Sequence, residues 1–144
     1  MSFLQSLNIS GSGLTAQRFR MDVISENIAN QDATRTENGG PYRRKMVVLT
    51  STSNNFKNMM LKNINGYEAG GVEVSEIVED ESEFKLVYNP EHPDADENGY
   101  VNMPNVDTLK ETVDMMEAYR AYQANITALN TTKQMAVKAL EIGR

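Results

Sequence analysis

The side chains best placed to do chemistry lie in a short stretch that reads DADENG. Oxygen-bearing side chains alternate along it and a turn-forming glycine ends it: Asp94, Asp96, Asn98 and Gly99. This is the pattern of the first half of a calcium-binding loop, but the twelfth position of such a loop must be a bidentate carboxylate and here it is Asn105. A surface turn is therefore the favoured interpretation. A calcium-responsive binding module using Asp94–Asn98 is the alternative hypothesis.

Other catalytic or metal-binding chemistry finds little support in the residue types. The chain has one histidine, His92, and no cysteine, so one copy cannot build a two-histidine metal site or a cysteine-based zinc site. His92 precedes Pro93, which is typical of an exposed turn. The glycines form neither a GxGxxG pattern nor a P-loop. We therefore expect no enzyme and no cofactor.

The charge of the chain is strongly acidic and unevenly distributed. The 144 residues carry a net charge of −6, which disfavours a nucleic-acid partner. Residues 68–97 contain eleven acidic side chains and a single lysine, whereas residues 1–67 contain eight basic and four acidic side chains. A contact between unlike patches on neighbouring copies would be favoured by this asymmetry. The sequence contains no run of eighteen apolar residues, so no membrane span is predicted. The N-terminus lacks the pattern of a cleaved signal peptide.

The first element expected to position these residues is a long N-terminal helix. All four prolines lie between residues 41 and 104, which favours helices at both ends. Apolar residues recur at intervals of seven, with a companion Ile24: Leu7, Leu14, Met21 and Ile28. Gly11 and Gly13 interrupt this pattern, and they either break the helix or let another helix approach closely.

The C-terminal end carries a second heptad pattern. Its positions alternate at steps of four and three: Met115, Tyr119, Tyr122, Ile126, Leu129, Lys133, Ala136 and Leu140. Three apolar residues sit one position out of phase upstream and broaden the stripe, which predicts more than one partner helix: Leu109, Val113 and Met116. Asn105 or Asp107 is the expected N-cap.

The middle of the chain is rich in β-branched residues and turn signals. Short strands are predicted over Tyr42–Thr50, Val72–Val78 and Phe84–Tyr88, and a loop over 51–66 with a helical turn at Phe56–Leu61. The fold class is thus mainly α with a small β region, the terminal helices packing as a coiled coil. Three segments are expected, a helical one over 1–32, a middle one over 33–104 and a helical one over 105–144.

One motif, Asn27-Ile28-Ala29-Asn30, ends the N-terminal pattern. A helix end with an asparagine in the left-handed conformation accounts for one of its asparagines but not for both.

Together these motifs resemble the rod and hook axial proteins of the bacterial flagellum, and most closely their proximal-rod, FlgC-type family. The shared axial signature is Asn27 and Asn30 at the end of the first helix, with the matching C-terminal heptads. The finer resemblance lies in Ser10–Leu14, Pro41–Arg43, Leu86–Tyr88, Pro93–Asp96, Gly99-Tyr100-Val101, Met103-Pro104-Asn105-Val106 and Tyr122–Asn125. In that family Asp96, Gly99 and Asn105 belong to a structural pattern and are not metal ligands.

The resemblance implies a structural subunit of the flagellar basal-body rod. Such a subunit is exported unfolded by the flagellar type III apparatus without signal cleavage, and it assembles in the periplasm or cell envelope. Its terminal helices line a hollow shaft that transmits torque and passes later subunits outward. The implied partners are copies of itself, other rod proteins, the adaptor between rod base and membrane ring, and the export apparatus.

The apolar stripes predict the same architecture on physical grounds. Helices that carry more apolar surface than one chain can bury should pack on copies related by a non-closing rotation, which builds a helical shaft. The predicted assembly interface consists of Leu7, Leu14, Met21, Ile24, Ile28, Met115, Tyr119, Tyr122, Ile126, Leu129 and Leu140.

Overall fold

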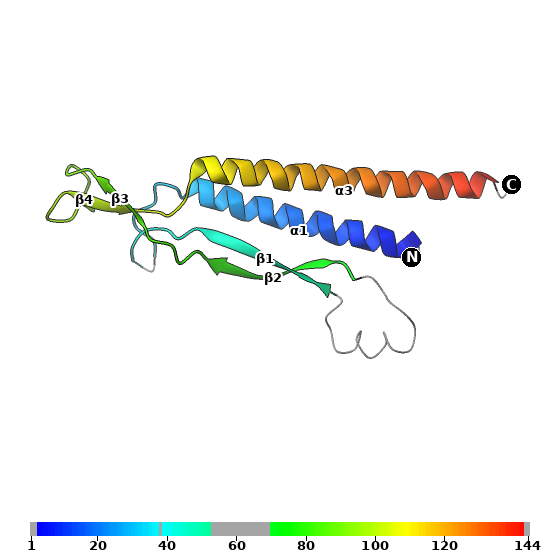
Figure 1. Cartoon of the computed structure of the whole chain (residues 1–144), viewed down its shortest axis with the longest axis horizontal. Coiled ribbons are helices and arrows are strands. Elements are labelled where there is room, and N and C mark those ends of the chain that lie inside the picture. Colours follow the sequence, from blue (N-terminus) through cyan, green and yellow to red (C-terminus); the bar gives the residue numbers. More distant parts are fainter. Residues whose placement is uncertain (1–2, 38, 53–69, 143–144) are drawn as a thin grey trace.

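Two long antiparallel helices form the body of the molecule. The computed structural model describes residues 3–37, 39–52 and 70–142. Helix α1 spans Phe3–Ala29 and helix α3 spans Thr108–Ile142. They lie side by side with both chain termini at the same end (Figure 1). With the short strands described next, this confirms the predicted fold class, mainly α with a small β region.

The strands form two separate two-stranded antiparallel sheets. Strand β1 (Lys45–Ser51) pairs with β2 (Val72–Glu79), and β3 (Lys85–Tyr88) pairs with β4 (Tyr100–Met103). The sequence did not predict β4, because its four residues fall between a turn glycine and a proline. The first predicted strand began too early, since the residues just before Lys45 make side-chain contacts with the helices instead.

Helix α1 is the middle layer of the molecule, with α3 on one side and the β1–β2 ribbon on the other (Figure 1). It runs through its glycine-rich stretch unbroken. A methyl group at Gly13 would lie only 3.2 Å from Nδ2 of Asn125 on α3. On the ribbon side, the Ser12 hydroxyl accepts a 3.0 Å hydrogen bond from the backbone of Val72. The glycine interruption therefore serves close approach, and a broken helix is the wrong alternative.

The interface between the two helices contains half of the C-terminal heptad positions that the sequence predicts. Two sets of positions spaced by seven are buried or half-buried along α3: Glu111, Ala118, Asn125 and Thr132, and Met115, Tyr122, Leu129 and Ala136. The other half of the predicted pattern is exposed: Tyr119, Ile126, Lys133 and Leu140. On α1, Ile24 is buried, and the four predicted heptad positions are half-buried: Leu7, Leu14, Met21 and Ile28. Small and polar side chains therefore alternate along this interface with half-buried apolar ones, while a second set of large apolar side chains on α3 remains exposed.

Two further features concern the limits of the described chain. The predicted helical turn at Phe56–Leu61, and most of the loop over 51–66, lie outside the described residues. Within the described part, neither helix has the length of apolar sequence that a membrane crossing requires.

The two helical glycines should respond differently to alanine. Nothing lies within 4 Å of a methyl group placed at Gly11, so Gly11→Ala should raise the free energy of unfolding by about 1 kcal/mol through helix propensity. Gly13→Ala should show little or none of this gain, because its methyl group must displace Asn125. Urea denaturation followed by circular dichroism measures both. Equal stabilisation by the two variants would contradict close approach at Gly13.

Candidate functional site

A buried polar junction ties α1, α3 and β1 together at the end of the helices far from the termini. We define it by five residues: Asn27, Tyr42, Arg44, Lys45 and Glu111. The Asn27 amide nitrogen donates to the Lys45 carbonyl at 2.9 Å and to the Glu111 carboxylate at 3.0 Å. Its oxygen accepts from the Tyr42 hydroxyl at 3.0 Å and from the Lys45 backbone at 2.9 Å. Asn27, 1% exposed, thus makes every hydrogen bond that its amide allows.

The charge at the junction is balanced by an arginine. Glu111 is fully buried, and Nε of Arg44 donates to its second carboxylate oxygen at 2.5 Å. The same guanidinium reaches Asp114 at 3.2 Å and Asp80 at 3.7 Å. A carboxylate taken out of water is tolerated only when it is paired and hydrogen-bonded. Glu111 therefore fixes α3 to the residues that enter β1.

Asn105 fastens the segment before α3 to the same place. Its side-chain oxygen accepts from the backbone of Arg44 at 2.8 Å, and its nitrogen donates to the carbonyl of Asp80 at 3.0 Å. The helix N-cap is instead Asp107, whose carboxylate accepts from the backbone of Leu109 at 3.0 Å. Of the two predicted caps, Asp107 is correct and Asn105 is wrong, because its side chain is already occupied by the strand segments.

The two asparagines of the Asn27–Asn30 motif have different tasks. Asn27 is the centre of the junction. Asn30 closes the last turn of its own helix by donating to the Glu26 carbonyl at 2.9 Å. No non-glycine residue in the described ranges has a positive φ, so the interpretation of this motif as a helix end with a left-handed asparagine, which accounted for only one of the two asparagines, is wrong.

Tyr42 is held neutral at the junction. Burial, followed by the charges of Glu26, Glu111 and Glu79, raises the pKa of its hydroxyl from 10.0 to about 12. A protonated hydroxyl is required for the hydrogen bond to Asn27. The surrounding carboxylates thus favour the form of Tyr42 that the junction uses.

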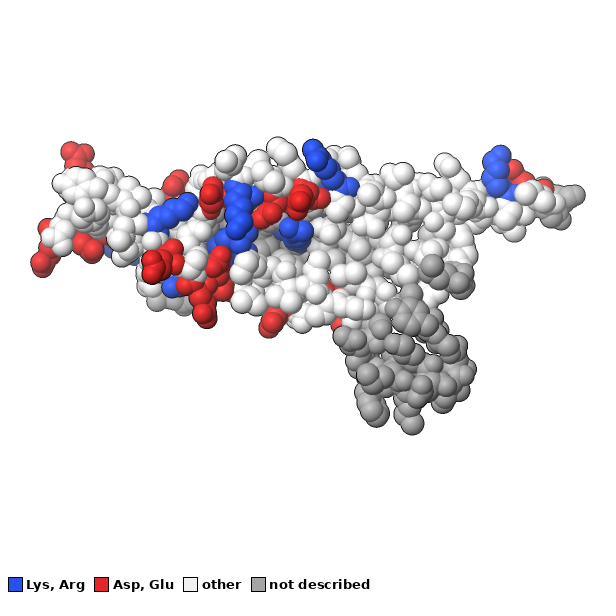
Figure 2. Space-filling view, viewed as in Figure 1, with Lys and Arg blue, Asp and Glu red and all other residues white. Residues whose placement is uncertain are grey.

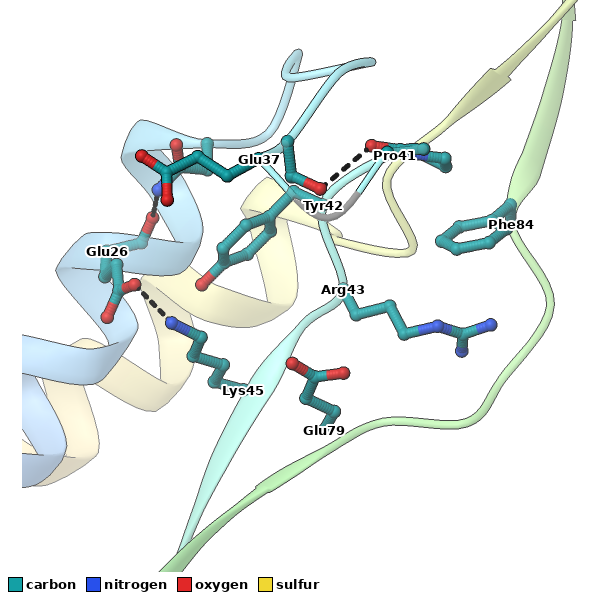
Figure 3. A pocket seen from close by; sticks show the side chains of 12 residues that line it. Glu26, Glu37, Pro41, Tyr42, Arg43, Lys45, Glu79 and Phe84 are labelled. Atoms are coloured by element: carbon teal, nitrogen blue, oxygen red, sulfur yellow. Dashed lines mark hydrogen bonds and ion pairs between the residues drawn. The ribbon is translucent and has the colours of Figure 1, made fainter.

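An open depression of about 810 Å³ lies beside Tyr42 (Figure 3). Three of its charged side chains are engaged within the chain. Lys45 pairs with Glu26 at 2.6 Å, and the Arg43 guanidinium stacks 4.4 Å from the centre of the Phe84 ring. Arg43 also donates to the Asp80 carbonyl at 3.1 Å. These contacts hold the β2–β3 connection against the start of β1.

The calcium-like stretch forms the turn between β3 and β4. The Asp94 carboxylate accepts from the Thr34 hydroxyl at 2.9 Å and pairs with Arg35; the Thr34 hydrogen bond and the Arg35 charge lower its pKa. Gly99 adopts a φ of +78°, the left-handed region that glycine tolerates. The Asp94 carboxylate therefore anchors the turn to the segment after α1.

His92 and the remaining motif residues differ in their surroundings. His92 is half-buried and its Nδ1 accepts from the backbone of Asp94 at 3.1 Å, so the expected exposed histidine is wrong. The other motif residues differ in burial: Gly99 and Pro104 are buried, Asn125 is half-buried, and Pro93, Asp96 and Tyr100 are exposed.

Sequence patterns singled out Asn27, and Tyr42 as part of the Pro41–Arg43 motif, but they missed Arg44 and Glu111. Tyr42 and Arg44 were assigned to a strand, and Glu111 was not singled out. A signal was present for Glu111, which lies seven residues before Ala118 on a seam of small side chains. Arg44 had no such signal, because its partners lie 67 and 70 residues further along the chain.

Replacing the two motif asparagines should separate their roles. Asn27→Ala removes partners from Glu111, Tyr42 and Lys45 at a buried site, and each buried group left without a hydrogen bond costs about 1–3 kcal/mol. We expect its free energy of unfolding to fall by roughly 3 kcal/mol or more. The matched control Asn30→Ala loses one local hydrogen bond and should lose about 1 kcal/mol or less. Thermal unfolding of both variants tests this, and equal losses would contradict the central place of Asn27.

Tyr42 should make stability depend on pH in alkali. Between pH 10 and 12 the unfolded chain loses this proton while the folded chain keeps it. The free energy of unfolding should therefore fall as pH rises, by at most about 1.4 kcal/mol per pH unit, and should show no such dependence below pH 10. Denaturation across this range should show a steeper fall for the natural chain than for Tyr42→Phe. Identical slopes would show that Tyr42 ionises normally.

Comparisons with known proteins identify the family. The family model for flagella basal body rod proteins matches residues 7–35, and the model for the C-terminal part of flagellar basal body rod FlgEFG proteins matches residues 97–142. The flagellar basal-body rod protein FlgC of Bacillus subtilis is 54% identical over the full length of both chains. FlgC of Borreliella burgdorferi is 45% identical over 99% of this chain and 98% of its own. FlgC of Salmonella typhimurium is 43% identical over the full length of both.

None of these matches supports the calcium hypothesis. A full-length relative at 54% identity, together with family models that match both terminal regions, places the chain without ambiguity: it belongs to the FlgC family of flagellar basal-body rod proteins.

Proposed function

We propose that this chain is a structural subunit of the proximal part of the flagellar basal-body rod. It packs in a helical array with copies of itself and with other rod proteins, and the array forms the hollow shaft that transmits torque and passes exported subunits. The proposal is supported by full-length relatives that are named basal-body rod proteins. It assigns the chain a role in assembly rather than in catalysis.

The observation that carries the proposal is the apolar surface left open along α3. Large apolar side chains remain exposed from its first turn to its last described residue: Leu109, Val113, Met116, Tyr119, Ile126, Met135, Val137, Leu140 and Ile142. Leu109 and Leu140 are each 77% exposed. Surfaces of this extent are typical of protein interfaces, and burying them yields about 25 cal/mol per Å² of apolar area.

The predicted interface divides between two tasks in this proposal. Tyr119, Ile126 and Leu140 are exposed, and the proposal assigns them to neighbouring subunits. The remaining members are half-buried or buried within the chain, so they support the helix pair and contact neighbours at their edges. Figure 2 agrees with this division, since the helices toward the termini show few charged side chains on the face in view.

The finer parts of the proposal concern location and partners. Segments 1–32 and 105–144 form the inner shaft, and segment 33–104 lies further out. The subunit reaches the periplasm or cell envelope through the flagellar export apparatus without signal cleavage, and it contacts the adaptor at the rod base. The proposal needs neither a nucleic acid nor a membrane span.

A charge on the exposed side of α3 should block assembly without unfolding the chain. Ile126→Asp and Leu140→Asp place a carboxylate on surface that we assign to neighbours, and each should abolish swimming and incorporation into basal bodies. Purified Leu140→Asp should keep the unfolding midpoint of the natural chain, because Leu140 is 77% exposed. Ile126 is 37% exposed, so purified Ile126→Asp should stay folded with a lower midpoint. Ser75→Asp, which places a carboxylate at an exposed position on β2 instead of α3, is the control and should swim. Normal swimming by both Ile126→Asp and Leu140→Asp would contradict the proposed interface.

A further inference from the structure

The β3–β4 hairpin presents an apolar outer face that the described part of the chain leaves uncovered. Residues opposite each other in an antiparallel pair share a face, and Tyr88 lies opposite Tyr100 while Val87 lies opposite Val101. Val101 is 2% exposed, so its face is the inner one. Three apolar or aromatic side chains share the outer face, and we call them the hairpin patch: Leu86 (67% exposed), Tyr88 (66%) and Tyr100 (45%).

The hairpin patch is held in a defined shape. The rings of Tyr88 and Tyr100 meet edge to face, with centroids 5.3 Å apart. A methyl group at Gly99 would lie 3.0 Å from the ring of Tyr88, so the ring rests directly on the turn. Pre-positioned tyrosines lose little conformational entropy on binding and are common at the centres of interfaces. An apolar face held in this way is suited to docking on another surface.

The surroundings of the hairpin patch are acidic. Four exposed carboxylates flank the hairpin: Glu83, Glu91, Asp96 and Glu97. Among the described residues, the Asp94 carboxylate is the one in this stretch that pairs with an arginine. The Lys85 amine is bound to the Val106 carbonyl at 2.6 Å. Figure 2 shows acidic side chains around this end of the molecule. The partner surface should therefore be apolar and carry basic side chains.

The first half of α3 has such a surface. Leu109, Val113 and Met116 follow one another on one face of the helix and are 77%, 53% and 55% exposed. Arg120 continues the same face one turn further, and no ion pair or side-chain hydrogen bond engages it within the described residues. We call these four residues the α3 seat. It offers the hairpin patch an apolar surface and one arginine, while the neighbouring Glu117 carboxylate lies 3.9 Å from the Arg20 guanidinium.

We propose that the hairpin patch of one copy docks on the α3 seat of a second copy of this chain. The hairpin projects past the end of the helix pair (Figure 1), which leaves its outer face free to reach a neighbour. Because patch and seat are different surfaces, the contact is heterologous and extends from copy to copy. This inference rests on the proposed rod function and names one of the contacts that would build the rod.

Cysteine cross-linking tests the contact directly, because the natural chain has no cysteine. The double variant Leu86→Cys with Met116→Cys is expressed in place of the natural chain in swimming cells, and basal bodies are isolated and oxidised. Disulfides form only between residues whose Cα atoms lie within about 7 Å. We expect dimers and larger cross-linked oligomers from the double variant and none from either single variant. Tyr88→Cys with Val113→Cys is the second pair, and Leu86→Cys with Leu140→Cys is the negative control.

A charge exchange provides an independent readout. Glu97→Lys and Arg120→Glu, each combined with the cysteine pair, should lower the cross-linked yield roughly two- to fivefold, as expected for loss of one exposed ion pair. Combining the two exchanges should restore the yield. Glu73→Lys, which changes an exposed acid on β2, should leave it unchanged.

The outcomes separate this contact from the proposed function. Absence of the natural chain from basal bodies would overturn the rod function and the contact together. Presence of the chain without cross-links from either cysteine pair would overturn the contact alone. Cross-links from Leu86→Cys alone would show hairpin meeting hairpin, and products containing a different rod protein would show another partner. Both of these results would also overturn docking on a second copy.

Discussion

The pairing of Glu111 with Arg44 and Asn27 is the interaction on which the arrangement of the elements depends. A fully buried carboxylate in a chain with so small a core needs compensation from every side. It receives that compensation from the end of α1 and from the residues that enter β1. Because these segments are distant in sequence, the requirement fixes both helices and the ribbon at one point.

The remainder of the helix pair combines close approach with apolar contact. Small side chains let the backbones come together at Gly13 and Asn125, and half-buried Met115, Tyr122 and Leu129 lie along the same helix. A second set of large apolar side chains on α3 stays exposed. In the proposed function, this exposed set is the surface that neighbouring subunits cover.

The middle segment also combines polar contacts that fix its position with an exposed apolar surface. Polar contacts from Thr34, Arg35 and Asn105 hold the β3–β4 turn and the entry to α3 in place. The Thr34 and Arg35 contacts use the carboxylate of Asp94, the first residue of the calcium-like stretch. The apolar outer face of the hairpin remains open, and this is the surface that we propose for contact with a neighbour.

The sequence by itself determined the two helices, the fold class and the family. Proline-free ends, heptad spacing and the motifs around Asn27 and Pro104 are local patterns, and local patterns can be seen in one chain. It also showed that α3 has more apolar surface than one partner helix can cover. The strand boundaries predicted from the sequence were close to those of β1, β2 and β3 in the structure. Strand β4 was not predicted, because its four residues are too few to give a periodic signal.

Only the tertiary structure decided which side of each helix faces its partner and what the polar motif residues do. Periodicity defines a stripe but does not say which half of it meets α1 and which half meets solvent. The roles of Asn27 and Glu111 depend on a hydrogen bond between residues 84 positions apart. Such a bond follows from the meeting of three separate elements, and no spacing along the chain encodes it.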